Sequence, residues 1–161
     1  AYFNKFKNTW AHGDFIEIND HGGVVIYGRS DATLNPGGVR IGTAEIYRIV
    51  ESLPKVDDSL VIGQEWNNDQ RIILFLKLNK TKKLTNKLSD VIKQTIKTSL
   101  SPRHVPSLIF QVEDIPYTIS GKKVELAVKK IIEGDSVVNQ DALSNPESLD
   151  LYRSIPGLSS L

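Results

Sequence analysis

The sequence predicts an α+β domain, in which a small mixed three-stranded sheet packs with helices and a two-stranded hairpin precedes it. The first observation is the order of the apolar patterns, which alternate between strand-like and helix-like segments as β-β-loop-α-β-β-α-β-α. The second is composition, since 40% of the 161 residues are hydrophobic, a share that can form a buried core. Together they favour one domain, or one domain with a remnant of another.

The first predicted element is a hairpin over residues 14–29. Apolar residues cluster at 15–18 and again at 24–27, and the segment between them, NDHGG, is dense in turn formers. The stretch that follows holds a proline and two glycines at 36–38. This composition is typical of a domain boundary or of a loop close to a ligand.

A helix is predicted from Thr43 to Leu53, with apolar residues along one face. We expect Thr43 to be its N-cap, because a threonine hydroxyl can accept a backbone hydrogen bond at a helix start. Two dense apolar segments follow at 58–65 and 71–78, joined by a polar turn. Their apolar density predicts strands at central positions of the sheet.

The rest of the chain predicts two more helices, one more strand and a largely irregular tail. Each helix shows apolar residues at helical spacing and a residue that stops it, proline in one case and glycine in the other. The predicted elements are a helix over 86–100, a strand over 107–112, a helix over 124–133 and, within the tail, a short helix at 146–152.

Charge and composition exclude several classes of protein. Twenty basic against nineteen acidic residues give a net charge of +1, so no overall field favours nucleic acid or an anionic membrane as a partner. No apolar run is long enough to cross a bilayer. The absence of cysteine excludes disulfides and thiolate chemistry, and fits a reducing compartment, the cytosol being our expectation.

Common catalytic motifs are also missing. The segment SGKK at 120–123 is not a phosphate-binding P-loop, because Pro116 stands where that motif needs glycine and Lys123 where it needs serine or threonine. The three histidines, at positions 12, 21 and 104, are isolated from one another. We interpret them as surface or turn residues rather than as members of a triad or metal site.

Three segments remain as candidates for chemistry. Asp14 lies at the start of a predicted strand. A carboxylate there can accept two hydrogen bonds from a vicinal diol such as a ribose. Arg29, Asp31 and Arg40 surround the glycine-rich stretch, and two arginines beside a closely approachable backbone suit phosphate or carboxylate. Each has a plainer interpretation, as an ordinary strand-start aspartate and as a linker with solvated charges.

The third segment is PYTISGKKVE at 116–125. Pro116 stiffens the approach, and Gly121 permits a backbone twist that presents Lys122 at the tip of a turn. A lysine ammonium is a compact charge that can stabilise negative charge developing on a phosphoryl or carboxylate group. The plainer interpretation is an ordinary surface lysine, and composition alone favours it.

Taken together and in this order, the three segments resemble the carboxyl-terminal part of the adenylate-forming acyl-CoA synthetases. The residues that carry the resemblance are GD at 13–14, GRSDATLNPGGVRIGTAEI at 28–46 and PYTISGKK at 116–123. The resemblance is strongest to members that activate acetoacetate, and it extends through LSNPESLDLYRSIPGL at 143–158. It therefore covers nearly the whole chain, which also lacks methionine and which we interpret as a fragment.

The resemblance implies a two-step reaction and a two-domain enzyme. Acetoacetate would attack the α-phosphate of ATP to give an acyl-adenylate and pyrophosphate, and the thiol of CoA would then displace AMP. Residues 1–30 would be the end of a large amino-terminal domain, otherwise missing here, and 31–161 a mobile carboxyl-terminal domain with an extended tail. Mg²⁺ would accompany ATP, with ligands outside this chain.

The resemblance also implies residue roles, position by position. Lys122 would be the catalytic lysine of adenylation, bridging the acyl carboxylate and the α-phosphate. Asp14 would hold the ribose hydroxyls, Arg29 would lie near the ribose and phosphates, and Arg40 close to phosphate. Asp31 would be the hinge residue.

Two further roles concern CoA. Gly38 would belong to a loop that lines the pantetheine channel, and Lys97 falls where a relative has a basic residue near the CoA 3′-phosphate. The chain departs from the family pattern at Ala32, where a second acidic residue is usual, and at Glu125, where a basic residue is frequent.

Two alternatives stay open at this stage. The first is the carboxyl-terminal domain of an acetyl- or propionyl-CoA synthetase, because the acyl pocket that distinguishes these enzymes would lie upstream of residue 1. The second is a stand-alone, non-catalytic module that binds CoA or a protein partner.

Overall fold

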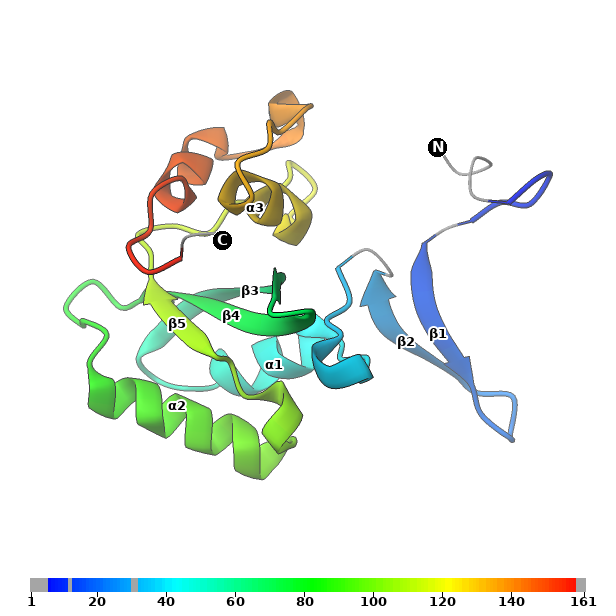
Figure 1. Cartoon of the computed structure of the whole chain (residues 1–161), viewed down its shortest axis with the longest axis horizontal. Helices are drawn as coiled ribbons and strands as arrows, with labels where there is room; N and C mark the ends of the chain where they lie inside the picture. The colour runs from blue at the N-terminus through cyan, green and yellow to red at the C-terminus, as the bar shows by residue number, and fades with distance from the viewer. Residues whose placement is uncertain (1–5, 12, 30–31, 159–161) are drawn as a thin grey trace.

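The computed structural model describes residues 6–11, 13–29 and 32–158. Figure 1 shows a body in which helices cover both faces of a sheet, with a hairpin projecting to one side. The hairpin joins β1 (Asp14–Ile18) and β2 (Val24–Arg29) antiparallel, as predicted. Its turn is organised by Asn19, whose Oδ1 accepts the backbone N–H groups of His21 at 3.1 Å and Gly23 at 2.8 Å.

The sheet has three strands in the order β3-β4-β5, and it is mixed, as predicted. β3 (Val56–Trp66) and β4 (Asp69–Leu78) are antiparallel, whereas β5 (Leu108–Gln111) runs parallel to β4. Asn67 and Asn68 connect the first two strands, both with positive φ, of 51° and 59°. Such two-residue connections match the twist of the strands they join, and asparagine tolerates this backbone region.

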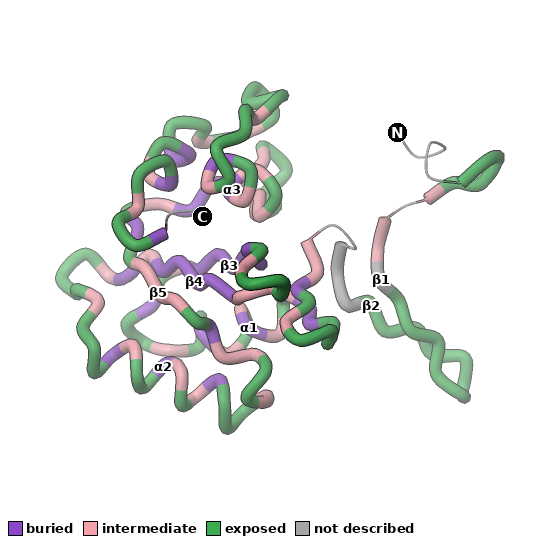
Figure 2. The backbone as a smooth tube through the Cα atoms, viewed as in Figure 1, coloured by how far each residue is buried: buried purple, intermediate pink, exposed green. Residues whose placement is uncertain are grey.

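One prediction about the sheet is wrong, because only β4 is central and β3 lies at its edge. The apolar density of β3 has another cause. From Ser59 to Gln64 every residue of β3 is buried, because helices cover both faces of the sheet. Figure 2 shows this contrast, with β3 and β4 buried and the β1–β2 hairpin largely exposed.

Two helical layers enclose the sheet. On one face, α1 (Thr43–Val50) and α2 (Asn86–Ser99) bury Ile46, Val50, Ile92 and Ile96 against it. On the other, α3 (Glu125–Ile132) packs with the tail. The remaining elements are short 3₁₀ helices, η1 (Pro36–Gly38), η2 (Pro102–His104), η3 (Gln140–Ala142) and η4 (Pro146–Tyr152).

The start of α1 differs from the prediction. Thr43 is the first residue of α1 rather than its N-cap; Gly42 occupies the cap position, and no side chain caps that end. At α2 a threonine does cap, since Thr85 Oγ1 accepts the N–H of Leu88 at 3.2 Å. The short helix predicted in the tail is η4, with 3₁₀ geometry. In the described residues, no helix combines the length and apolar character needed to span a membrane.

Candidate active site

Residues 116–123, here called the Lys122 turn, form a tight loop that presents Lys122 at its tip. The backbone N–H of Thr118 donates to the carbonyl of Lys122 at 2.8 Å, and Thr118 Oγ1 accepts the N–H of Lys122 at 3.0 Å. Gly121 has φ of 77° and donates to the carbonyl of Thr118 at 2.9 Å. The Lys122 side chain is exposed and contacts no acceptor among the described residues. Backbone and side-chain hydrogen bonds thus close the turn and leave the side chain of Lys122 exposed.

The tail contacts this turn through hydrogen bonds of Asn145. Its Oδ1 accepts the N–H of Tyr117 at 2.9 Å, while its Nδ2 donates to Asp114 Oδ2 at 2.7 Å and to the carbonyl of Ile115 at 2.9 Å. The N–H of Ile119 adds a bond to the carbonyl of Ala142 at 2.9 Å. The tail therefore contributes to the geometry of the Lys122 turn.

Residues 35–40, here called the glycine loop, carry Gly38 and Arg40. Leu34 and Ile41 close its base with two backbone hydrogen bonds, and both side chains are buried. At its top, Gly38 has φ of 76° and no atom lies within 4 Å of where a Cβ would stand. The backbone at Gly38 is therefore open to the approach of another molecule.

Two side chains from elsewhere hold the glycine loop at Gly37. Asp69 Oδ1 accepts the N–H of Gly37 at 2.8 Å, and Arg103 Nη1 lies 3.5 Å from the Gly37 carbonyl. The N–H groups of Gln70 and Gly37, with a smaller effect from Arg103, lower the pKa of Asp69. Asp69 is therefore a carboxylate at neutral pH, and it anchors the loop from the first residue of β4.

The other expected site residues fall in three places. The hairpin register pairs Asp14 with Arg29, so these two are brought together at one end of β1 and β2. Asp31 lies outside the described residues. Lys97 is exposed in the last turn of α2, and α2 covers the face of the sheet opposite α3 (Figure 1). Lys97 thus lies on a different layer from the helix that follows Lys122.

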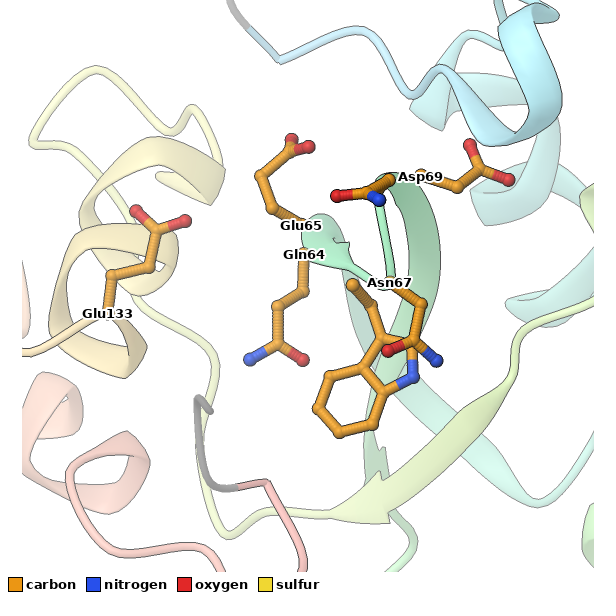
Figure 3. A pocket seen from close by; sticks show the side chains of 7 residues that line it. Gln64, Glu65, Asn67, Asp69 and Glu133 are labelled. Atoms are coloured by element: carbon orange, nitrogen blue, oxygen red, sulfur yellow. The ribbon is translucent and has the colours of Figure 1, made fainter.

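A cleft of about 470 Å³ lies beside the β3–β4 turn (Figure 3). Glu133, at the end of α3, faces that turn across the cleft. The lining contains the three carboxylates of Glu65, Asp69 and Glu133 and no basic side chain. It is therefore unsuited to the phosphates of ATP or CoA, and Lys122 does not belong to it.

Sequence reasoning missed three residues that shape the site, namely Asp69, Asn145 and Lys123. Their partners lie far away in the chain, and no local pattern marks them. Within the described residues, no group of three or more histidine, aspartate or glutamate side chains could hold a metal ion.

Comparison with known proteins finds relatives along nearly the whole chain. No protein-family model matches the chain. An acetoacetyl-coenzyme A synthetase of Rhizobium meliloti (strain 1021) is 55% identical over 160 residues, which cover 99% of this chain and 25% of that protein. The Xenopus tropicalis acetoacetyl-CoA synthetase is also 55% identical, over 98% of this chain and 24% of the relative.

The chain is homologous to one segment of the acetoacetyl-CoA synthetases. A solved structure of acetoacetyl-CoA synthetase from Streptomyces lividans superimposes with a TM-score of 0.84 and 42% identity, over 94% of this chain and 23% of that one. The fold is that of the carboxyl-terminal domain of adenylate-forming enzymes. The chain spans about a quarter of the length of the acetoacetyl-CoA synthetases that it matches. The resemblance drawn from the motifs is confirmed.

Proposed function

We propose that this chain is the mobile carboxyl-terminal part of an enzyme that joins acetoacetate to CoA through an acyl-adenylate. The overall reaction converts ATP, acetoacetate and CoA into acetoacetyl-CoA, AMP and pyrophosphate. The observation that carries the proposal is the exposed Lys122 on a braced turn, within a chain that is 55% identical to acetoacetyl-CoA synthetases along nearly all its length.

In this proposal Lys122 acts in the first step. An exposed ammonium on a rigid turn can be placed between the acetoacetate carboxylate and the α-phosphate, where negative charge grows as the new P–O bond forms. Its charge would stabilise that transition state, and the rigid turn would spare the enzyme the entropy of ordering a loop. Withdrawal of the turn would then leave room for the thiol of CoA.

The hairpin and glycine loop would supply the remaining contacts. Asp14, paired in register with Arg29, would hold the ribose, and Arg29 would lie near the phosphates. Gly38 would line the channel for the pantetheine arm, since its backbone is open to approach. Arg40 would lie close to phosphate, and Lys97 would contact the 3′-phosphate of CoA from α2.

We also propose that residues 1–30 complete a large amino-terminal domain and that 31–161 form the domain that rotates, with Asp31 as hinge. Exposed apolar side chains on the hairpin support this division, since Ile16, Ile18 and Ile26 are 53%, 67% and 67% exposed. Strands with such side chains are usually covered by a further layer. The amino-terminal domain would provide that layer, the acyl pocket and the ligands of the Mg²⁺ that accompanies ATP. A cytosolic location accords with the cysteine-free sequence.

The test is the substrate dependence of pyrophosphate exchange by the full-length enzyme. Labelled pyrophosphate should enter ATP when acetoacetate is present and at least tenfold more slowly with acetate or propionate. Equal or faster exchange with acetate or propionate would show that this acid, and not acetoacetate, is the substrate. No exchange with any of the three acids would favour a non-catalytic binding module. Titration calorimetry would then measure whether that module binds CoA.

A further inference from the structure

Lys123, the neighbour of Lys122, is half-buried among acceptors, whereas Lys122 is exposed. Its Nζ donates to Asp58 Oδ1 at 2.5 Å, to Glu51 Oε1 at 2.6 Å and to the carbonyl of Ser59 at 2.5 Å. Only 16% of the side chain is exposed. Burial lowers the pKa of Lys123, but the bonds to Asp58 and Glu51 outweigh it and raise the pKa, so the ammonium stays charged.

These acceptors lie along the outer edge of the sheet. β3 pairs with β4 on one side only, so its outward backbone groups need other partners. Lys123 Nζ satisfies the carbonyl of Ser59, and Tyr47 Oη accepts the N–H of Val61 at 3.1 Å. The Lys122 turn is therefore fastened to the free edge of β3 by a side chain rather than by a further strand.

Two tyrosines complete the arrangement. Lys123 Nζ lies 4.4 Å from the ring centroid of Tyr47, and Tyr117 Oη donates to Asp58 Oδ2 at 2.8 Å. Tyr47 Oη also donates to Glu125 Oε1 at 2.9 Å, which ties in the first turn of α3. We call these contacts around Lys123 the Lys123 cluster; they join the Lys122 turn to α1, β3 and α3.

The backbone links the placement of Lys123 to the direction of Lys122. Lys123 forms an isolated antiparallel bridge with Tyr117, so the backbone is extended at this point. Successive side chains of an extended chain point to opposite sides. With the side chain of 123 held against β3, that of 122 must face away from the sheet edge, into solvent.

Stability alone does not account for an ion-pair cluster at this position. Replacing all partners of such a pair together by apolar residues of similar size is often neutral for stability, because the charges lose their hydration on burial. Three hydrogen bonds from one ammonium, to Glu51, Asp58 and the carbonyl of Ser59, nevertheless restrict where the turn can lie against β3. What the ion pairs add over an apolar contact is therefore orientation.

We propose that Lys123 is a positioning residue for adenylation, which aims Lys122 by fastening the Lys122 turn to Glu51, Asp58 and the edge of β3. This inference rests on the proposed function. It predicts that loosening the cluster impairs the step in which Lys122 acts and spares thioester formation, in which it does not. A purely structural role would impair both steps equally.

The experiment measures both half-reactions of the full-length enzyme with Lys123→Met, a change of similar length without charge. We expect acetoacetate-dependent pyrophosphate exchange to fall about tenfold or more in kcat, since small misplacements of a reacting group have large effects. Thioester formation from supplied acetoacetyl-adenylate should stay within about twofold of wild type. Lys130→Met is the matched control, an exposed lysine of the same domain, and should leave both rates unchanged.

A second variant covers the case in which Lys123→Met does not fold. Asp58→Asn keeps the side-chain shape, removes one charge from the other side of the cluster, and should give the same split between the half-reactions. Equal loss in both half-reactions, or exchange within twofold of wild type in the folded variants, overturns the inference. Wild-type enzyme without acetoacetate-dependent exchange would instead overturn the proposed function itself.

Discussion

The backbone N–H of Gly37 donates to Asp69 Oδ1 at 2.8 Å, so a carboxylate at the start of β4 holds the glycine loop from 32 residues away. If Gly38 lines the CoA channel as proposed, this bond contributes to thioester formation. It has no evident part in the adenylation step, which depends on the Lys122 turn. The two loops can therefore be perturbed separately.

Asp69→Ala should raise the KM for CoA by roughly threefold or more, because the glycine loop loses an anchor for its backbone. Pyrophosphate exchange should be unchanged. Asp69→Asn is the matched control, since the amide oxygen keeps the acceptor, and its KM should lie closer to wild type. Steady-state kinetics with CoA as the varied substrate make the comparison. An unchanged KM in the alanine variant would show that Asp69 does not contribute to CoA binding.

The acid stability of the same anchor follows from the lowered pKa of Asp69. A carboxyl group whose pKa is lower in the folded state stabilises that state above its unfolded pKa, and the stabilisation is lost as pH falls through the folded pKa. The difference in melting temperature between wild type and Asp69→Asn should therefore be constant from pH 7 to about pH 5 and shrink only below about pH 4. A difference that disappears between pH 6 and 5 would contradict this assignment.

Asn145→Ala should destabilise the chain by about 2–3 kcal/mol, because it removes four side-chain hydrogen bonds, a long one from Ser144 Oγ among them, and leaves the Tyr117 N–H without its acceptor. Urea denaturation gives the free energy of unfolding. Gln140→Ala serves as control, since Gln140 is exposed and its side chain makes one bond of 3.3 Å, and it should cost less than about 0.5 kcal/mol. Similar losses in both variants would show that the tail does not depend on Asn145.

The hairpin and the sheet should differ in hydrogen exchange. In this chain alone, amides of β1 and β2 should exchange at least a hundredfold faster than those of β4, because an isolated two-stranded hairpin is marginally stable whereas β4 is central and buried. Exchange measured by NMR or mass spectrometry resolves the two. Equal protection would argue against residues 1–30 belonging to a separate domain.

Local patterns predicted most elements of this fold, because the helices and the hairpin carry their signals in adjacent residues. Two predictions failed for physical reasons. The edge position of β3 was missed because an edge strand covered on both faces has the apolar density of a central one. The start of α1 was misassigned by one residue because Thr43 is a good cap by type, while the backbone turns at Gly42.

Local sequence patterns predict less of the candidate site than of the fold. Lys122 could not be distinguished from a surface lysine by its own segment, and only the resemblance across several segments raised its significance. Lys123 was passed over because its acceptors lie 72 and 65 residues away, at Glu51 and Asp58. Such contacts exist only once the sheet edge has formed.

The central claim is that Lys122 supplies the charge for adenylation alone, and the Lys122→Ala variant of the full-length enzyme tests it most directly. Acetoacetate-dependent pyrophosphate exchange should fall a hundredfold or more, as expected for the loss of a group that stabilises transition-state charge. Thioester formation from supplied acetoacetyl-adenylate and CoA should stay within about twofold of wild type. An equal fall in both half-reactions, or unchanged exchange, would contradict the account.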